Sequence, residues 1–286
     1  MTKVEKYVDS SMFEAEPMTN EIKVSLLWMT PDPLGAIAAA CRMYEGKPTH
    51  DLADISPMER EHYFSEAQKT HLTAPLEFVK LHFFLEGVDR AFTHQMVRQR
   101  TAVFAQESLR FAVKDNFAEE SGLPPSIAKL PKEHPTRQQW DRHMNHTQQF
   151  YNYMIGNDIP AEDARAILPQ CTTTRLNYCT DLRNLSDHSG NRLCTQAQFV
   201  WREVFTKMVQ AIRDFKHDGS VRSRDQWQFD ALADSGLFKP VCYRLGKCPF
   251  GADFDRGCTI RERADRGAFV EIDDVEWMYD EKAAWQ

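Results

Sequence analysis

The chain has 286 residues, of which 42% are hydrophobic and 27% are charged. This balance is typical of a globular protein that can bury a full core, and it predicts one large domain or one domain with an appendage. The formal net charge of -7 means that the whole molecule does not attract polyanions. Nucleic acid is therefore not an expected partner, and any anionic ligand must be held by a local cluster of bases.

Apolar runs and cysteines indicate the cellular setting. The longest apolar stretches, such as 26–29 and 36–41, are far shorter than the roughly 20 residues that a membrane span needs, and no basic-then-apolar leader is recognisable. Seven cysteines, an odd number, are scattered along the chain. This is not the pattern of a disulfide-stapled secreted domain, so we expect a cytoplasmic protein without a membrane partner.

The first elements that the patterns predict are a strand and two helices. Apolar residues alternate along residues 22–28, at Ile22, Val24, Leu26 and Trp28. The Thr-Pro-Asp-Pro run at 30–33 ends this strand and opens a helix that reaches Met43. Ser56-Pro57 begins a second, highly charged helix that ends near Lys69.

The middle of the chain predicts another strand and two more helices. Residues 78–85 alternate so that one face is fully apolar, and we expect Gly87 to end the strand. Residues 88–100 have helical spacing and place arginines at the end of that helix. Residues 113–140 predict a surface excursion, which leads to a helix around 140–155.

The last third predicts one long helix and a distinct tail. Residues 192–216 have an apolar helical face, formed by Ala197, Val200, Trp201, Val204 and Met208. Residues 217–286 differ in character, with three cysteines and several adjacent Asp and Arg residues. We therefore divide the chain into a main domain, 1–216, and a C-terminal extension, 217–286, packed on the same domain.

The segment from Arg98 to Arg110 carries the chemistry. Three arginines, a glutamate and a serine fall within thirteen residues of an otherwise acidic chain. Charge runs are usually solvated surface, but arginine also forms forked hydrogen bonds with phosphate or with a uracil-type carbonyl. Arg98-Gln99-Arg100, followed by seven residues and Ser108, resembles the Arg-His-Arg signature of the flavin-dependent thymidylate synthases.

Further elements resemble the same family and follow in the same order. The run His71-Leu72-Thr73-Ala74-Pro75-Leu76-Glu77 is similar to the family's His-containing approach to a Glu. Residues 162–169 are similar to its Glu-x-x-Arg-x-x-Leu-Pro element, and Arg183, Arg192 and Ala197-Gln198 are similar to its closing helix pair. Four elements in family order make coincidence the weaker explanation.

The resemblance implies both a fold and a reaction. The fold is α+β, with a mixed or antiparallel sheet flanked by helices and with long helices at the subunit interfaces of a homotetramer. The reaction is the reductive methylation of dUMP to dTMP, with methylenetetrahydrofolate as carbon donor and NADPH-reduced FAD as hydride source. The flavin carries the difficult electron chemistry. No Gly-x-Gly-x-x-Gly loop is present, but the family places its flavin across subunit interfaces instead.

The resemblance also assigns roles to residues. Arg192 and Arg165, from different subunits, would place cations against the uracil ring or its phosphate, and with Ser108 they form the expected catalytic set. The residues expected to hold dUMP are Gln95, Arg98, Ser108, Arg110, Arg165 and Arg192. Those expected to contact the flavin are His71, Thr73, Glu77, Arg98, Gln99, Arg100, Glu107 and Arg183.

Departures from the family pattern keep alternatives open. Gln99 replaces the central histidine, which removes a titratable group but keeps a hydrogen-bonding side chain. A catalytically impaired or non-enzymatic nucleotide-binding homologue is therefore the alternative function. An RNA or nucleotide platform would stack bases on four phenylalanines, for which core packing is the simpler interpretation: Phe83, Phe84, Phe92 and Phe104. Methylation of uracil in RNA is disfavoured by the acidic pI.

Nucleophile and metal chemistry have weaker support. Ser108 has Glu107 beside it and no histidine in the local motif, so we assign it a binding role. Cys171 is expected to be a buried small hydrophobe, as most free cysteines are. The last three cysteines lie at spacings of six and ten and lack the paired geometry of a zinc site, so we expect no metal: Cys242, Cys248 and Cys258.

Overall fold

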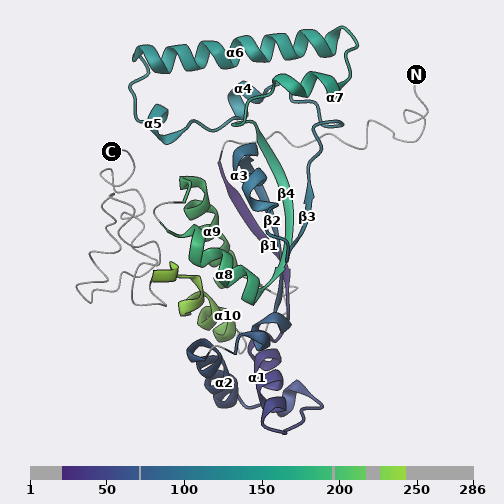
Figure 1. Ribbon diagram of the computed structural model, residues 1–286, viewed down its shortest axis with the longest axis vertical. Helices are drawn as coiled ribbons and strands as arrows, with labels where there is room; N and C mark the ends of the chain where they lie inside the picture. The colour runs from purple at the N-terminus through teal and green to yellow at the C-terminus, as the bar shows by residue number, and fades with distance from the viewer. Residues whose placement is uncertain (1–20, 71, 195–196, 217–225, 243–286) are drawn as a thin grey trace.

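The computed structural model describes residues 21–70, 72–194, 197–216 and 226–242. At the centre of these residues is a four-stranded antiparallel sheet with strand order β1-β2-β4-β3 (Figure 1). Its strands are β1 (Lys23–Met29), β2 (Lys80–Asp89), β3 (Val103–Gln106) and β4 (Thr173–Asp181). The predicted α+β class is confirmed, and every pairing in this sheet is antiparallel.

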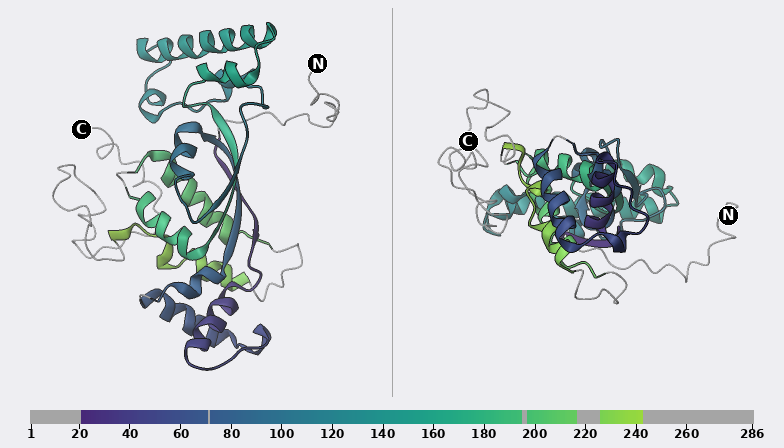
Figure 2. Two further views of the ribbon diagram at one scale, coloured as in Figure 1. Left: turned by 45° about the vertical axis from the view of Figure 1, so that its right-hand side comes forward. Right: turned by 90° about the horizontal axis from the view of Figure 1, so that it is seen from below.

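Helices lie beside the sheet and at both of its ends (Figures 1 and 2). In Figure 1, α8 and α9 lie beside the strands, α1 and α2 lie at the lower end, and the long α6 crosses above the upper end. The helices are α1 (Pro33–Tyr44), α2 (Pro57–Lys69), α3 (Arg90–Met96), α4 (Phe117–Glu120), α5 (Pro125–Ala128), α6 (Pro135–Gly156), α7 (Ala161–Ala164), α8 (Leu182–Arg192), α9 (Phe199–Arg213) and α10 (Gln226–Ala233).

The first two helices begin where the sequence predicts. Asp32 caps α1, because its Oδ1 accepts a hydrogen bond from the backbone N–H of Gly35 at 2.9 Å. Ser56 and Glu59 form a reciprocal capping box at the start of α2. Each helix also has a proline in its first turn, where the missing N–H costs no hydrogen bond.

A bulge interrupts the alternation of β1. The pairing of β1 with β2 shifts register between Leu26 and Trp28. The shift turns Trp28 outward, to 45% exposure, and brings Met29 into the core at 0%. The expectation that Trp28 continues the apolar face was therefore wrong, because an extra residue in one strand reverses the faces beyond it.

The central strand β2 is longer than predicted. Leu81, Phe83 and Leu85 are fully buried, which confirms the apolar face. Gly87 does not end the strand, because it lies at a register shift with φ of 74°, a conformation that glycine adopts readily, and pairing resumes at Val88. Asp89 then caps the following helix.

Two predicted helices are shorter than expected. The helix expected at 88–100 is α3, and it ends at Met96, so Arg98 and Arg100 lie beyond its C-terminus. The helix expected at 192–216 is α9, which begins only at Phe199 and ends at Arg213, while Arg192 is the last residue of the preceding helix α8. The predicted apolar face of α9 is confirmed by four buried residues: Val200, Trp201, Val204 and Met208.

The surface excursion predicted at 113–140 is only partly on the surface. A second small core forms beneath α6, because four buried side chains come together there: Phe117, Met144, Tyr151 and Ala164. Within the predicted extension, α10 packs against α9 and adds Phe229 and Leu232 to the main core, and the 3-10 turn Gly236–Phe238 packs against α8. Residues 217–225 and 243–286, with Cys248 and Cys258, lie outside the described residues.

Candidate functional site

The predicted site residues form separate groups within one chain. The first group surrounds Trp201 and holds Gln95 and Arg192, while the second follows β3 and holds Arg110 and Arg165. Among the described residues, Arg192 and Arg165 share no hydrogen-bond partner. His71, a predicted flavin contact, lies outside the described residues.

Arg192 lies at the end of α8, over the indole ring of Trp201. The guanidinium carbon is 4.5 Å from the ring centroid, and Nε donates to Nε2 of His188 at 3.4 Å. Burial lowers the pKa of Arg192, and the described part of the chain offers it no carboxylate as an ion-pair partner. A half-buried cation of this kind is suited to stabilising negative charge on a ligand.

Gln95 is held by the same tryptophan. The indole Nε1–H of Trp201 donates to Oε1 of Gln95 at 3.0 Å, and Nε2 of Gln95 donates to Oε1 of Gln198 at 2.5 Å. The helices α3 and α8, which are distant in sequence, thus bring two predicted dUMP-binding residues, Gln95 and Arg192, to one aromatic side chain on α9. Sequence reasoning placed Trp201 on an apolar face and did not assign it to the site.

His188, one turn earlier on α8, is the hydrogen-bond partner of Arg192. Burial, and then the charge of Arg192, lower the pKa of His188 to about 4. The imidazole is therefore neutral near pH 7, and Nε2 accepts the hydrogen bond from Arg192. The ring also makes edge contacts with Trp201 and Phe205, at centroid distances of 4.9 and 5.6 Å. No motif identified His188 from the sequence.

The second group begins with Glu107, directly after β3. Its Oε2 accepts hydrogen bonds from Nζ of Lys114 at 2.8 Å and from Oγ1 of Thr174 at 3.3 Å. The side chain of Lys114 is only 4% exposed, so this ion pair is buried. Through these two contacts, Glu107 holds the segment that follows β3 in place. The sequence did not identify Lys114 as the partner of Glu107.

Two predicted site arginines of this group, Arg110 and Arg165, contact Glu162. Nε of Arg110 is 3.5 Å from Oε1 of Glu162, and Nε of Arg165 donates to the backbone carbonyl of Glu162 at 3.1 Å. Burial, and then the charge of Arg165, lower the pKa of Arg90, while Glu107 acts in the opposite direction. Arg90 thus joins this group, although no sequence motif assigned it to the site.

Ser108 is an exposed residue of the same segment. Its Oγ accepts a hydrogen bond from the backbone N–H of Arg110 at 3.3 Å. The described residues place no histidine in hydrogen-bond contact with this hydroxyl, which supports a binding role over a nucleophilic one.

The remaining predicted residues lie near the ends of β2, α3 and α8. Arg183 and Glu77 form a hydrogen-bonded ion pair between the start of α8 and a 3-10 turn, Ala74–Phe78. Thr73 precedes that turn and is half-buried. Arg98 and Arg100 are exposed, and neither has a side-chain hydrogen bond or an ion pair within the described ranges.

Gln99 points into the protein between these two arginines. Its Oε1 accepts a hydrogen bond from the hydroxyl of Tyr178 at 2.8 Å, while its Nε2 is buried and has no partner in the described chain. Tyr178 is fully buried on β4, between Phe83 and Phe104. Burial raises the pKa of Tyr178, so the hydroxyl stays protonated and fixes the orientation of the Gln99 amide.

Comparisons with known proteins identify the family. The family model described as "Thymidylate synthase complementing protein" matches residues 25–215. The flavin-dependent thymidylate synthases of Pyrococcus horikoshii and Pyrococcus furiosus are 31% and 32% identical to the chain. Each alignment covers 85% of this chain, with 96% and 95% of the two relatives. The chain belongs to the flavin-dependent thymidylate synthase family.

Solved structures agree with this family fold. A flavin-dependent thymidylate synthase from Helicobacter pylori, solved with FAD and dUMP, gives a TM-score of 0.55 at 15% identity, covering 75% of this chain and 100% of that one. A UMP/dUMP methylase from Streptomyces cacaoi, bound with 5-Br dUMP, gives a TM-score of 0.55 at 19% identity, covering 68% and 91%. At these identities the likeness shows the fold alone.

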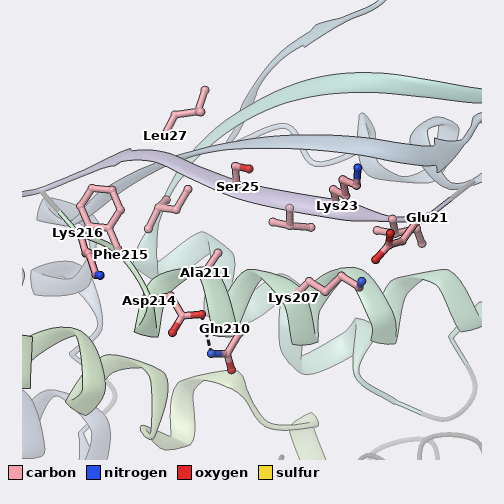
Figure 3. A pocket seen from close by; sticks show the side chains of 13 residues that line it. Glu21, Lys23, Ser25, Leu27, Lys207, Gln210, Ala211, Asp214, Phe215 and Lys216 are labelled. Carbon is pink, nitrogen blue, oxygen red and sulfur yellow. Dashed lines mark hydrogen bonds between the residues drawn. The ribbon is translucent and has the colours of Figure 1, made fainter. Parts of the chain in front are cut away.

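Other features of the structure bear on the nucleotide-platform, metal-site and membrane interpretations. Phe83 and Phe92 are fully buried, so core packing explains them and an exposed stacking platform does not. A groove between β1 and α9 is lined by residues such as Lys23 and Lys207 (Figure 3), and it contains none of the family-site residues. In the ranges that the structure describes, no cluster of three or more potential metal ligands occurs, and no helix has both the length and the apolarity to cross a bilayer.

Proposed function

We propose that the protein converts dUMP to dTMP by reductive methylation, with FAD as its cofactor. The observation that carries this proposal is the half-buried guanidinium of Arg192, which has no carboxylate partner in the described chain and lies over the indole of Trp201, the side chain that also binds Gln95. The Helicobacter pylori structure, solved with FAD and dUMP, supports the choice of both molecules.

Arg192 and Gln95 would bind the uracil ring. Methylation at C5 requires electron density to move onto that carbon, and negative charge develops on ring oxygens or nitrogen. A preorganised cation near those atoms lowers the barrier. The Gln95 amide supplies a directional hydrogen-bonding group, while Ser108, Arg110 and Arg165 supply the hydroxyl and the cations that suit a phosphate.

The two groups would form one site through assembly. We infer a homotetramer in which Arg192 of one subunit and Arg165 of another meet at the same nucleotide. Exposed apolar side chains support an assembled state, since Phe111 is 74% exposed, Val103 is 70% exposed and Tyr153 is 65% exposed. Contact with another subunit would remove such side chains from water, which favours association.

The residues after α3 fit a flavin. Arg98 and Arg100 present exposed guanidiniums, and Gln99 holds a buried amide donor, Nε2, without a partner among the described residues. An isoalloxazine ring offers carbonyl and nitrogen acceptors and a pyrophosphate offers anionic oxygens, so the donor set matches the group. When bound, the flavin supplies the hydride. Thr73, Glu77, Glu107 and Arg183 complete the predicted flavin contacts.

The co-substrates follow from the chemistry of the reaction. A new methyl group requires a one-carbon donor, for which we propose methylenetetrahydrofolate, and the flavin must be reduced again, for which we propose NADPH. A cytoplasmic setting suits these free small molecules. Cys41, Cys171 and Cys179 are free thiols, which supports a reducing compartment.

A second candidate is a homologue that binds nucleotide without turnover. The replacement of the signature histidine by Gln99 favours it, because one titratable group is lost. The fixed Tyr178–Gln99 hydrogen bond favours turnover, since it keeps an oriented donor at that position.

Absorption spectroscopy tests the flavin assignment. The purified full-length protein is expected to show flavin bands, or to take them up from added FAD, and to retain them through gel filtration. Arg98→Ala and Arg100→Ala are expected to lose flavin, whereas Arg142→Ala, at an exposed position of α6, is expected to retain it. A protein that stays colourless after incubation with FAD contradicts the proposal.

A further inference from the structure

We propose that Trp201 is a positioning residue that fixes Gln95 and Arg192 relative to each other, so that the amide and the cation approach the uracil ring as one unit. The inference rests on the proposed function in that dUMP is taken as the ligand. Three helices meet at this side chain, because Gln95 lies on α3, Arg192 ends α8, and Trp201 lies in the first turn of α9.

The indole uses two different chemical properties at once. Its Nε1–H donates in the ring plane to Oε1 of Gln95 at 3.0 Å, while its face lies 4.5 Å from the guanidinium carbon of Arg192. Phenylalanine offers the face without the donor, and leucine offers neither. Tryptophan is therefore the residue that connects an amide on one helix to a cation on another.

The orientation of Trp201 is fixed by its surroundings. The side chain is fully buried, with Phe92 at a centroid distance of 4.4 Å and Phe205 at 5.9 Å. The close packing of a protein interior leaves such a ring little freedom to turn. A rigid ring holds both Gln95 and Arg192, and their separation is set before a nucleotide arrives.

His188 completes the arrangement around Arg192. It accepts the hydrogen bond from Nε of the guanidinium at 3.4 Å and packs edge-on against Trp201. This contact occupies Nε and leaves the two terminal amino groups of Arg192 for a ligand. Trp201 thus contacts the face of the guanidinium, and His188 accepts the hydrogen bond from Nε. The two terminal amino groups form the end that would meet a ligand.

The partner of the amide supports the same conclusion. Nε2 of Gln95 donates to Oε1 of Gln198, the residue that precedes α9. Both polar ends of the Gln95 amide are therefore bound at the start of α9, Oε1 by Trp201 in its first turn and Nε2 by the cap residue Gln198. This fixes which end of the amide is donor and which is acceptor, as recognition of a uracil edge requires.

Calorimetric titration of the full-length protein with dUMP tests the inference. Trp201→Phe removes the N–H and keeps the face, so dUMP affinity is expected to fall about threefold to tenfold, the effect of one lost neutral hydrogen bond. Trp201→Leu is expected to weaken binding further, because Arg192 also loses its contact. Trp28→Phe, on the exposed part of β1, is the matched control and is expected to bind as the wild type does.

A double-mutant cycle separates positioning from general damage. If Trp201 acts through Gln95, the effects of Trp201→Phe and Gln95→Leu on dUMP affinity are not additive, because either change removes the same hydrogen bond. A purely structural role predicts additive effects, or a loss of thermal stability without a change in affinity. Either of those results, or wild-type affinity in Trp201→Phe, would overturn the inference.

A ligand-free readout distinguishes failure of the inference from failure of the proposed function. The indole N–H resonance of Trp201, assigned in protein labelled with ¹⁵N-tryptophan by its loss in Trp201→Phe, is expected to shift in Gln95→Leu. If the wild type binds no dUMP, the proposed function fails, and the inference is judged on this shift alone. An unchanged resonance overturns it.

Discussion

The hydroxyl of Tyr178 donates a hydrogen bond to Oε1 of Gln99 at 2.8 Å, at the position where the family signature has histidine. The amide presents a donor, Nε2, that does not titrate. Histidine at this position would introduce a group with a pKa near neutrality. Because burial lowers the pKa of an imidazole, we expect Gln99→His to add a limb below about pH 6.5 to the pH profile of turnover, absent from the wild type. Identical profiles would contradict this assignment.

Removal of the hydroxyl of Tyr178 tests the donor of the same hydrogen bond. Tyr178→Phe leaves Oε1 of Gln99 without its donor in a buried place, so the free energy of unfolding is expected to fall by about 1–3 kcal/mol. Flavin affinity is expected to fall as well, because the amide loses its fixed orientation. Urea unfolding and a flavin titration measure the two effects. Loss of stability with unchanged flavin affinity would show that the pair serves the core alone.

The buried imidazole of His188 makes stability depend on pH. Its pKa is lowered to about 4 in the folded protein, from 6.5. The unfolded chain therefore binds this proton first as the pH falls, and stability declines between pH 6.5 and about 4, by at most about 3 kcal/mol. His188→Phe removes this dependence, so its urea-unfolding free energy is expected to change less over that window. Parallel curves for the two proteins would show that the imidazole is not buried.

The ion pair between Lys114 and Glu107 predicts a large effect on stability. Lys114→Met leaves a shielded carboxylate without its cation and is expected to cost about 3 kcal/mol. Lys80 is the matched control, since its side chain is 51% exposed in its pair with Asp181. Lys80→Met is expected to cost under about 1 kcal/mol. Equal losses in chemical denaturation would mean that burial does not set the strength of these pairs.

If each site is shared between two subunits, two inactive variants are expected to complement each other. Arg192→Ala and Arg165→Ala are each expected to lose at least about 100-fold in turnover, since each removes a cation from the reacting ring or its phosphate. Co-expressed in one cell, they would form mixed tetramers in which about a quarter of sites have both arginines. Turnover that stays at the level of the single variants would place both residues in sites within one subunit.

Local signals explain which parts of the fold were predictable. Asp32 and Ser56 cap their helices through atoms within three residues, and Leu81, Phe83 and Leu85 display their buried face by alternation alone. Pairing between strands that are far apart in the sequence leaves no such local signal. No strand was predicted at Val103–Gln106 or at Thr173–Asp181, because the first is short and is stabilised by its register with the second.

Some residues of the candidate site were predictable from the sequence, and others were not. Motif spacing identified Gln95 and Arg192 as candidates, since family resemblance preserves order along the chain. It did not identify Trp201 as their common neighbour, because that contact depends on the end of α8 at Arg192 and on the packing of α9 against α3. Lys114 was missed for a similar reason, since burial alone separates it from other lysines.

Product formation tests the central claim most directly. The wild-type protein, supplied with FAD, NADPH, methylenetetrahydrofolate and dUMP without oxygen, is expected to form dTMP, measured by chromatography. Omission of NADPH, methylenetetrahydrofolate or dUMP is expected to abolish the product, and Arg192→Ala is expected to bind flavin but to form little dTMP. A flavin-loaded wild type that binds dUMP and is reduced by NADPH, yet forms no dTMP, would contradict the proposed reaction and leave a nucleotide-binding homologue.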